Sequence, residues 1–299
     1  MDRRSFLKQS LAGAGAAAAL GALNERETKA AGQPAKKQAM LKICSQVGRI
    51  PGKTLREKVL KIQDWGGVGI ELGGGFAGQM AEIRGALKGT KVGVAAICAG
   101  YFPLIDPDAG KRKDGIRRLK EMCGPAGEIG STGIIFVPAF NNHPMLPHKE
   151  SRKVLVEGLG EIGEVAAKAG TRILMEPLNR GEAYFLRQLA DAASICRDVD
   201  SPGIAMMGDF YHMFKEETSD CGAFLSAGRY LHHIHLASRT RKLPGQDERS
   251  FVDGFRGLKM IGYRDYCSLE CGIKKGTKAE QAIPQSFRFL EKQWAEAVV

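Results

Sequence analysis

The chain lacks the features that define several common classes of protein. Its seven cysteines form no Cys-x-x-Cys pair and are odd in number, which excludes a complete disulfide framework. After residue 31 no segment approaches the ~20 apolar residues that a membrane span needs. Aromatic residues make up only 7% of the chain, and the Lys/Arg-rich segments contain none between their charges. A nucleic-acid partner is therefore not expected, although the net charge is +11.

The first 31 residues have the composition of an export signal. Arg3 and Arg4 precede Ser5-Phe6-Leu7-Lys8 and a mildly apolar run of Ala, Gly and Leu, which is the pattern of a twin-arginine signal peptide. An ordinary secretory signal or a short anchor is the alternative. We expect a signal at residues 1–31, a linker at 32–39, and a periplasmic or otherwise extracytoplasmic protein with no stable membrane span after signal removal.

From residue 40 to residue 299, strand-like and helix-like segments alternate eight times. Glycines close several helices before the next strand, as in AAKAG before TRILM. The expected strands are 40–47, 68–74, 91–100, 132–139, 171–179, 202–210, 229–238 and 264–272, and the clearest helices are 54–65, 79–87, 149–168, 185–198 and 278–296. This order predicts an α/β protein with one (β/α)8 TIM barrel domain. An open doubly wound sheet is the alternative, but QVGRIPGK, after the first strand, is neither a Gly-x-Gly-x-x-Gly nor a Walker loop.

Chemically active side chains follow one another at the ends of the last four expected strands. The last acidic or imidazole side chains of these strands are Glu176, Asp209, His235 and Glu270, separated by 33, 26 and 35 residues. Each spacing is about one strand-helix unit, so the four side chains are expected at similar height on adjacent strands, where barrel enzymes carry their active sites. Taken singly, a strand-end carboxylate could cap the next helix, and a lone histidine could be a satisfied core group.

Three carboxylates gathered in one buried place would repel one another without a positive charge between them. A divalent cation is the usual solution, and a ligand set of oxygens with one nitrogen suits Mn²⁺, Mg²⁺ or Co²⁺ better than a structural zinc site. The sequence therefore predicts one divalent metal ion, with Mn²⁺ favoured.

The segments MEPLNRGE, GDFYHM, HIHLASRTR and LEC resemble the xylose-isomerase-like barrels called sugar phosphate isomerase/epimerase-like, and among them the ketose 3-epimerases of tagatose and psicose type. This resemblance implies that Glu176, Asp209, His235 and Glu270 are the metal ligands, and that Glu176 and Glu270 are also the catalytic acid/base pair. It further implies that Glu182, His212 and Arg241 bind the sugar.

The resemblance implies a metal-dependent isomerase or epimerase of a free, non-phosphorylated ketose or keto-sugar, acting by proton transfer through a metal-stabilised enediolate. The early strands depart from the pattern, because they offer only Glu71 and no clear aromatic sugar clamp. A lyase or hydrolase of 3-keto-glycosides and an inosose dehydratase stay open as alternatives.

Two more distant rivals also stay open. An endonuclease-IV-like phosphodiesterase would need further metal ligands from early strands, and a non-catalytic sugar-binding protein would be expected to lose one of the paired glutamates. We expect a small-molecule sugar as the partner, and a homo-oligomer is compatible with the sequence.

Overall fold

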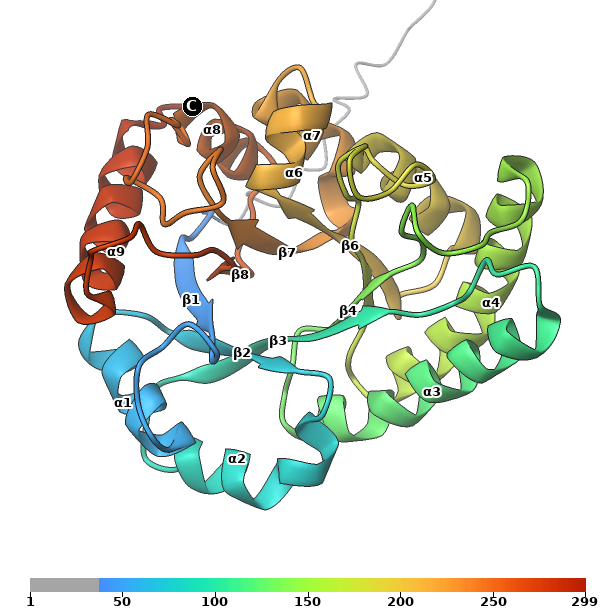
Figure 1. The fold of residues 1–299 in the computed structure, drawn as a ribbon, viewed down its shortest axis with the longest axis horizontal. Helices are drawn as coiled ribbons and strands as arrows, with labels where there is room; N and C mark the ends of the chain where they lie inside the picture. Colours follow the sequence, from blue (N-terminus) through green and yellow to red (C-terminus); the bar gives the residue numbers. More distant parts are fainter. Residues whose placement is uncertain (1–37) are drawn as a thin grey trace, which may run out of the picture. The chain divides into compact units, whose positions relative to one another are not determined.

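Eight parallel strands close into a barrel in the computed structural model, which describes residues 38–299 (Figure 1). Neighbours along the chain pair in order, and β8 pairs with β1 through Lys42↔Tyr266 and the next three residues of each strand. The strands are β1 Lys42–Gln46, β2 Gly69–Gly73, β3 Gly93–Tyr101, β4 Ile134–Val137, β5 Ile173–Met175, β6 Ile204–Asp209, β7 Leu231–Leu236 and β8 Tyr266–Leu269. The predicted TIM barrel is confirmed. The expected signal at 1–31 lies outside the described residues, as does most of the expected linker.

Helices surround the strands, as Figure 1 shows. The α-helices of the described residues are α1 Leu55–Asp64, α2 Met80–Leu87, α3 Ala109–Glu128, α4 His148–Lys168, α5 Leu189–Val199, α6 Phe210–Glu216, α7 Asp220–Ala227, α8 Val252–Met260 and α9 Ala279–Glu296. Local chemistry sets their ends: the Thr54 hydroxyl accepts a hydrogen bond from the Glu57 amide before α1, and Gly170, at φ +72°, follows α4. None of the described helices is long and apolar enough to cross a membrane.

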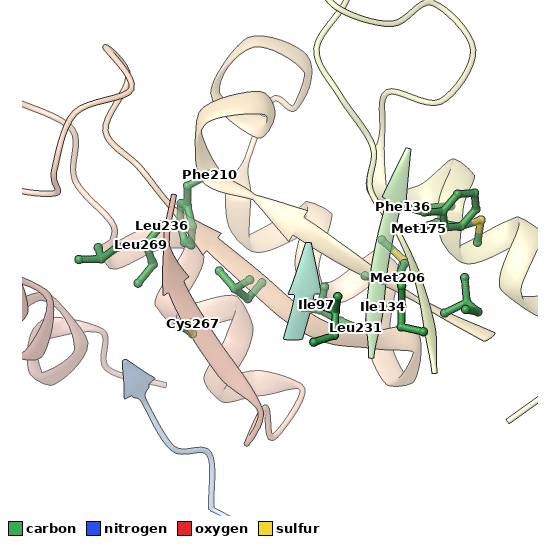
Figure 2. Close-up of a cluster of buried hydrophobic side chains, with 14 of the residues drawn as sticks. Ile97, Ile134, Phe136, Met175, Met206, Phe210, Leu231, Leu236, Cys267 and Leu269 are labelled. Atoms are coloured by element: carbon green, nitrogen blue, oxygen red, sulfur yellow. The ribbon is translucent and has the colours of Figure 1, made fainter. Parts of the chain in front are cut away.

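Strand side chains alternate between two apolar layers. Ala96, Ile135, Leu174, Ala205 and Met207 form a small cluster of their own, consistent with the side chains that fill the inside of such a barrel. Their chain neighbours belong to the large cluster that the strands share with the helices, part of which Figure 2 shows, with Phe136 beside Met175. All seven cysteines are free thiols, as their odd number requires of at least one.

The structure differs from the sequence-based boundaries in three places that matter for the site. Strand β5 has only three residues, so Glu176 lies just beyond it, although its backbone N–H still donates to the Phe136 carbonyl at 3.1 Å. The expected helix at 185–198 begins later, at Leu189, because Phe185 packs in the core and the preceding loop is part of the site. Between β6 and β7 the chain forms two helices where one was expected.

Candidate metal and sugar site

The four predicted ligands come together at the carboxyl ends of adjacent strands β5 to β8. One ligand atom from each of Glu176, Asp209, His235 and Glu270 lies within 4.8 Å of the others. Asp209 and His235 are fully buried and paired in register across β6 and β7. The nitrogen Nδ1 of His235 lies 3.5 Å from Glu176 Oε1 and 3.3 Å from Glu270 Oε2. The predicted convergence is therefore present, and the ligand roles stay a proposal.

Asp209 caps a helix and also faces the cluster. Its Oδ1 accepts the Tyr211 N–H at 2.7 Å at the start of α6. Its Oδ2 is buried and, like Nδ1 of His235, has no hydrogen-bond partner within residues 38–299. Two buried polar atoms without partners, facing two further carboxylates, are costly unless another group binds them. The donor set of three carboxylates and one imidazole suits a divalent cation at this position.

Different surroundings give the three carboxyl groups of the cluster different pKa values. Burial, followed by the nearby Glu270 charge, raises the pKa of Asp209 to about 8, and burial likewise raises the pKa of Glu176. Burial acts in the same direction on Glu270, but the charge of His235 outweighs it and lowers the pKa of Glu270 to about 2. The pKa of His235 is raised well above its usual value by Glu71 and Glu270, against the effect of its own burial. Carboxylates so close together cannot all ionise without a compensating positive charge.

The three predicted sugar-binding residues lie beside this cluster. Arg241 donates through Nη2 to Glu270 Oε2 at 2.8 Å, and its Nη1 lies 3.6 Å from Glu182 Oε1 and 3.3 Å from His212 Nε2. The backbone N–H of Asn179 donates to Nδ1 of His212, which leaves Nε2 as the protonated nitrogen, 3.5 Å from Asp209 Oδ2. Burial and the Arg241 charge lower the pKa of His212 to about 3, so its ring is neutral.

Arg241 has a strained backbone. Its φ of +55° lies in the left-handed region, which non-glycine residues seldom occupy. The turn is fixed by its own N–H donating to the Ser238 carbonyl and by the Gly272 N–H donating to the Arg241 carbonyl. The guanidinium carbon lies 4.7 Å from the Tyr211 ring centroid. Strain of this kind is found where a side chain must be aimed at a site.

Residues outside the predicted set also contribute to the site. Gln46, at the end of β1, hydrogen-bonds both Glu71 and Glu270, and His233 hydrogen-bonds Glu71. The period-two alternation of β7 could have found His233, which faces the same side as His235. Gln46, like the acids, lies at the carboxyl end of its strand, but it is uncharged, so a search for charged residues does not find it.

Three aromatic rings lie at the end of β3 and in the segment after β4, where the sequence shows no clear clamp. The rings of Tyr101 and His143 stack with centroids 4.0 Å apart, and the Phe140 centroid is 6.0 Å from that of Tyr101. The backbone N–H of Asn141 donates to the Glu182 carbonyl at 2.8 Å. These rings therefore border the loop that carries one of the predicted sugar ligands.

Comparisons with known proteins identify the family and the relatives of this chain. The family model described as "Xylose isomerase-like TIM barrel" matches residues 59–293. The chain is 30% identical over 261 residues to the 3-dehydro-D-guloside 4-epimerase of Escherichia coli (strain K12), covering 84% of this chain and 99% of the relative. It is 26% identical to a probable ketose 3-epimerase of Synechocystis, covering 69% of this chain and 74% of the relative. A D-psicose 3-epimerase of Ruminiclostridium cellulolyticum is 33% identical over 40% of this chain and 41% of its own.

Solved structures show the same barrel. The 3-keto-D-glucoside 4-epimerase from E. coli superposes with a TM-score of 0.78 at 27% identity, covering 85% of this chain and all of the other. A D-psicose 3-epimerase determined in the presence of D-fructose gives a TM-score of 0.76 at 20% identity, with 85% and 99% covered, which is a likeness of fold.

Proposed function

Because the chain belongs to the xylose isomerase-like TIM barrel family, we propose that it is a metal-dependent epimerase of a non-phosphorylated keto-sugar, inverting a carbon next to the carbonyl. The epimerase names of the relatives that align over most of the chain support an enzyme of this class. The observation that carries the proposal is the placement of two carboxylates, Glu176 and Glu270, on either side of Asp209 and His235 in one cluster.

Inversion at carbon needs one group to remove a proton and another to return one. Glu176 comes from β5 and Glu270 from β8, with β6 and β7 between them. A sugar lying over the cluster would have one carboxylate at each end. One carboxylate takes the proton from the carbon beside the carbonyl, which leaves a planar enediolate, and the other carboxylate, in its acid form, delivers a proton to the opposite face.

Glu176, Asp209, His235 and Glu270 would hold a divalent cation, which when bound supplies a Lewis acid that acidifies the carbon next to the carbonyl. The other residues hold the sugar. The Arg241 guanidinium and the Glu182 carboxylate offer donors and acceptors to hydroxyl groups, and the neutral His212 offers Nε2–H. The rings of Tyr101, Phe140 and His143, connected through Asn141 to the loop of Glu182, would offer the sugar an apolar face. Free ketoses and keto-glycosides both fit this description.

Proton exchange tests the proposal directly. Protein loaded with Mn²⁺ is incubated in D2O with free ketoses, 3-keto-glycosides and inososes, and the products are analysed by NMR. We expect deuterium at one carbon next to the carbonyl, together with the epimer at that carbon. Exchange accompanied by loss of water or of the aglycone would replace the epimerase with a lyase, and no exchange with any compound would refute proton transfer at carbon.

Export is the second part of the proposal. The pattern Arg3-Arg4-Ser5-Phe6-Leu7-Lys8 supports a twin-arginine signal that ends near residue 31. This route exports proteins that have already folded, and the free, mostly buried cysteines of the barrel are compatible with folding in a reducing compartment. An epimerase exported in this way would act on sugars outside the cytoplasm.

A further inference from the structure

Behind the four proposed ligands lies a second, fully buried polar group inside the barrel. Oε2 of Glu71, on β2, is 2.8 Å from Nε2 of His233 and 3.0 Å from Nε2 of His235, both on β7. None of the three side chains has any exposed surface. A carboxylate with no access to water persists in a core only when it is well paired.

The Glu71 carboxylate fixes which nitrogen of His235 faces the cluster. Both oxygens of Glu71 face nitrogen: the side-chain nitrogen of Gln46 donates to Oε1, and Oε2 lies at hydrogen-bond distance from Nε2 of His233 and of His235. The carboxylate therefore acts only as an acceptor. Nε2 of His235 must therefore donate, and in the neutral ring Nδ1 carries the lone pair. That Nδ1 is the atom that lies 3.3 Å and 3.5 Å from the Glu270 and Glu176 oxygens.

Gln46 connects this buried group to a second proposed ligand. Its side-chain nitrogen donates to Glu71 Oε1 at 2.8 Å and to Glu270 Oε1 at 3.0 Å. Both N–H bonds of the amide are used, and the Glu270 carboxylate is held by one oxygen. The other oxygen, Oε2, is left to face His235 and to accept from Arg241.

We infer that Glu71 and Gln46 are positioning residues of the metal site: Glu71 selects and orients the His235 tautomer, and Gln46 fixes the rotamer of Glu270. The inference rests on the proposed function, since it assigns an outer shell to the proposed ligands. Partners of this kind orient metal-binding histidines in many proteins, and losing one costs about 10–100-fold in metal affinity.

The same atoms suggest one other arrangement, a second cation held by Glu71, His233 and His235, whose ligand atoms also lie within 4.8 Å of one another. Separations of 2.8 Å and 3.0 Å between nitrogen and oxygen are those of direct hydrogen bonds, in which a proton occupies the space between the atoms. Hydrogen bonding within the group therefore accounts for it better than a second ion does.

Metal binding by Glu71→Gln tests the inference without use of the sugar. The amide keeps the volume of the carboxylate but removes its charge and offers a nitrogen where an oxygen stood. The affinity for Mn²⁺ and the number of ions bound are measured on metal-stripped protein from the EPR signal of free Mn²⁺, and the spectrum of bound Mn²⁺ reports the symmetry of its ligands. Gln46→Met is the second variant, because it removes the amide, and with it the donors to Glu71 and Glu270, from a chain of similar length.

Ser268→Ala is the matched control, since Ser268 is fully buried on β8 and its hydroxyl has no hydrogen-bond partner among the described residues. We expect wild type and the control to bind one ion equally well. Glu71→Gln should bind about 10–100-fold more weakly with a changed spectrum of the bound ion. Gln46→Met should lose less affinity for Mn²⁺. If Glu71→Gln does not fold, the test uses Gln46→Met alone.

Three results would overturn the inference. The first is a folded Glu71→Gln variant whose affinity for Mn²⁺ and spectrum of bound Mn²⁺ equal those of wild type. If only Gln46→Met folds, the same result in that variant counts instead. Either result would remove the positioning role and leave the proposed function intact. Two ions in wild type and one in Glu71→Gln would replace the hydrogen-bonded group with a second metal site. Wild type that binds no Mn²⁺ would remove the metal-dependent function and this inference together.

Discussion

Glu176 and Glu270 are chemically identical side chains in different surroundings. Glu270 accepts from Gln46 and Arg241, while Glu176 has His235 Nδ1 3.5 Å from its Oε1 and is 5% exposed. We expect either Glu→Gln change to lower kcat at least 10²–10⁴-fold, because each removes a carboxylate that must take or return a proton. Steady-state rates and metal content are measured side by side, so that weaker metal binding is separated from lost acid/base chemistry. A Glu270→Gln enzyme that keeps its metal and near-normal exchange in D2O would contradict the two-carboxylate mechanism.

Arg241 allows the side chain and the backbone to be tested separately. Arg241→Ala and Arg241→Gly both remove the guanidinium, and we expect both to raise KM strongly while leaving the metal bound. Because φ is +55°, glycine relieves strain that alanine keeps, so the glycine variant should be more stable by about 1 kcal/mol. Thermal unfolding measures the difference. Equal stability of the two variants would show that the left-handed conformation costs the protein nothing.

At the scale of elements, helix α6 holds the loop that carries Glu182. The Glu216 carboxylate, near the end of α6, accepts from the backbone N–H of Arg180 at 2.6 Å and from its guanidinium at 2.8 Å and 3.1 Å. Arg180 immediately follows Asn179, whose amide donates to Glu182 and whose backbone N–H donates to His212. The position of two proposed sugar ligands thus depends on an ion pair between a helix and a loop.

The pH dependence of stability tests this ion pair. Burial raises the pKa of Glu216, but the hydrogen bonds from Arg180 outweigh it and lower the pKa below the usual 4.5. A group whose folded pKa is lowered stabilises the fold above its unfolded pKa and loses that contribution as pH falls through the folded value. We therefore expect Glu216→Gln to lower Tm by a few degrees at pH 7 and to raise KM. The gap in Tm should be constant above about pH 5 and close at lower pH. A gap that does not change with pH would show that the carboxylate charge has no part in it.

At the scale of the whole molecule, the four proposed ligands lie at the ends of four of the eight strands. An ion bound between them would therefore cross-link half of the barrel. Binding to the folded state alone stabilises it by mass action, by about 2.7 kcal/mol at an ion concentration 100 times Kd. For a barrel of this size we expect Mn²⁺ to raise Tm by about 5–10 °C over the chelator-treated protein. Asp209→Asn is the control that should lose most of the rise. A Tm that is the same with chelator and with Mn²⁺ would argue against the metal site.

The cellular location is a property of the whole chain that the barrel does not determine. If residues 1–31 are a twin-arginine signal, replacing Arg3 and Arg4 by Lys should hold the protein in the cytoplasm, because that route requires the arginine pair. Fractionation of cells that express the two forms measures it. Undiminished export of the Lys-Lys form would favour the general secretory route.

The barrel and its four clustered side chains could be predicted from the sequence because their signals are periodic. Eight strand-helix units specify the closed sheet, and since parallel strands end at one face, Glu176, Asp209, His235 and Glu270 had to meet there. Exact element ends were less predictable. Helix α5 begins at Leu189 because packing of Phe185 and contacts of the preceding loop override the local helical pattern.

Only the tertiary structure decided how these side chains are held. Glu71 and His235 are 164 residues apart, and Gln46 and Glu270 are 224 apart, yet each pair is joined by a hydrogen bond. Barrel closure brings β1 beside β8, and β2 across from β7, and no local pattern encodes those distances or the rotamers that close packing selects. Composition and spacing could place acids and imidazoles at one end of the barrel. The choice of His235 nitrogen and of Glu270 oxygen that face the cluster depends on contacts made only when the sheet is closed.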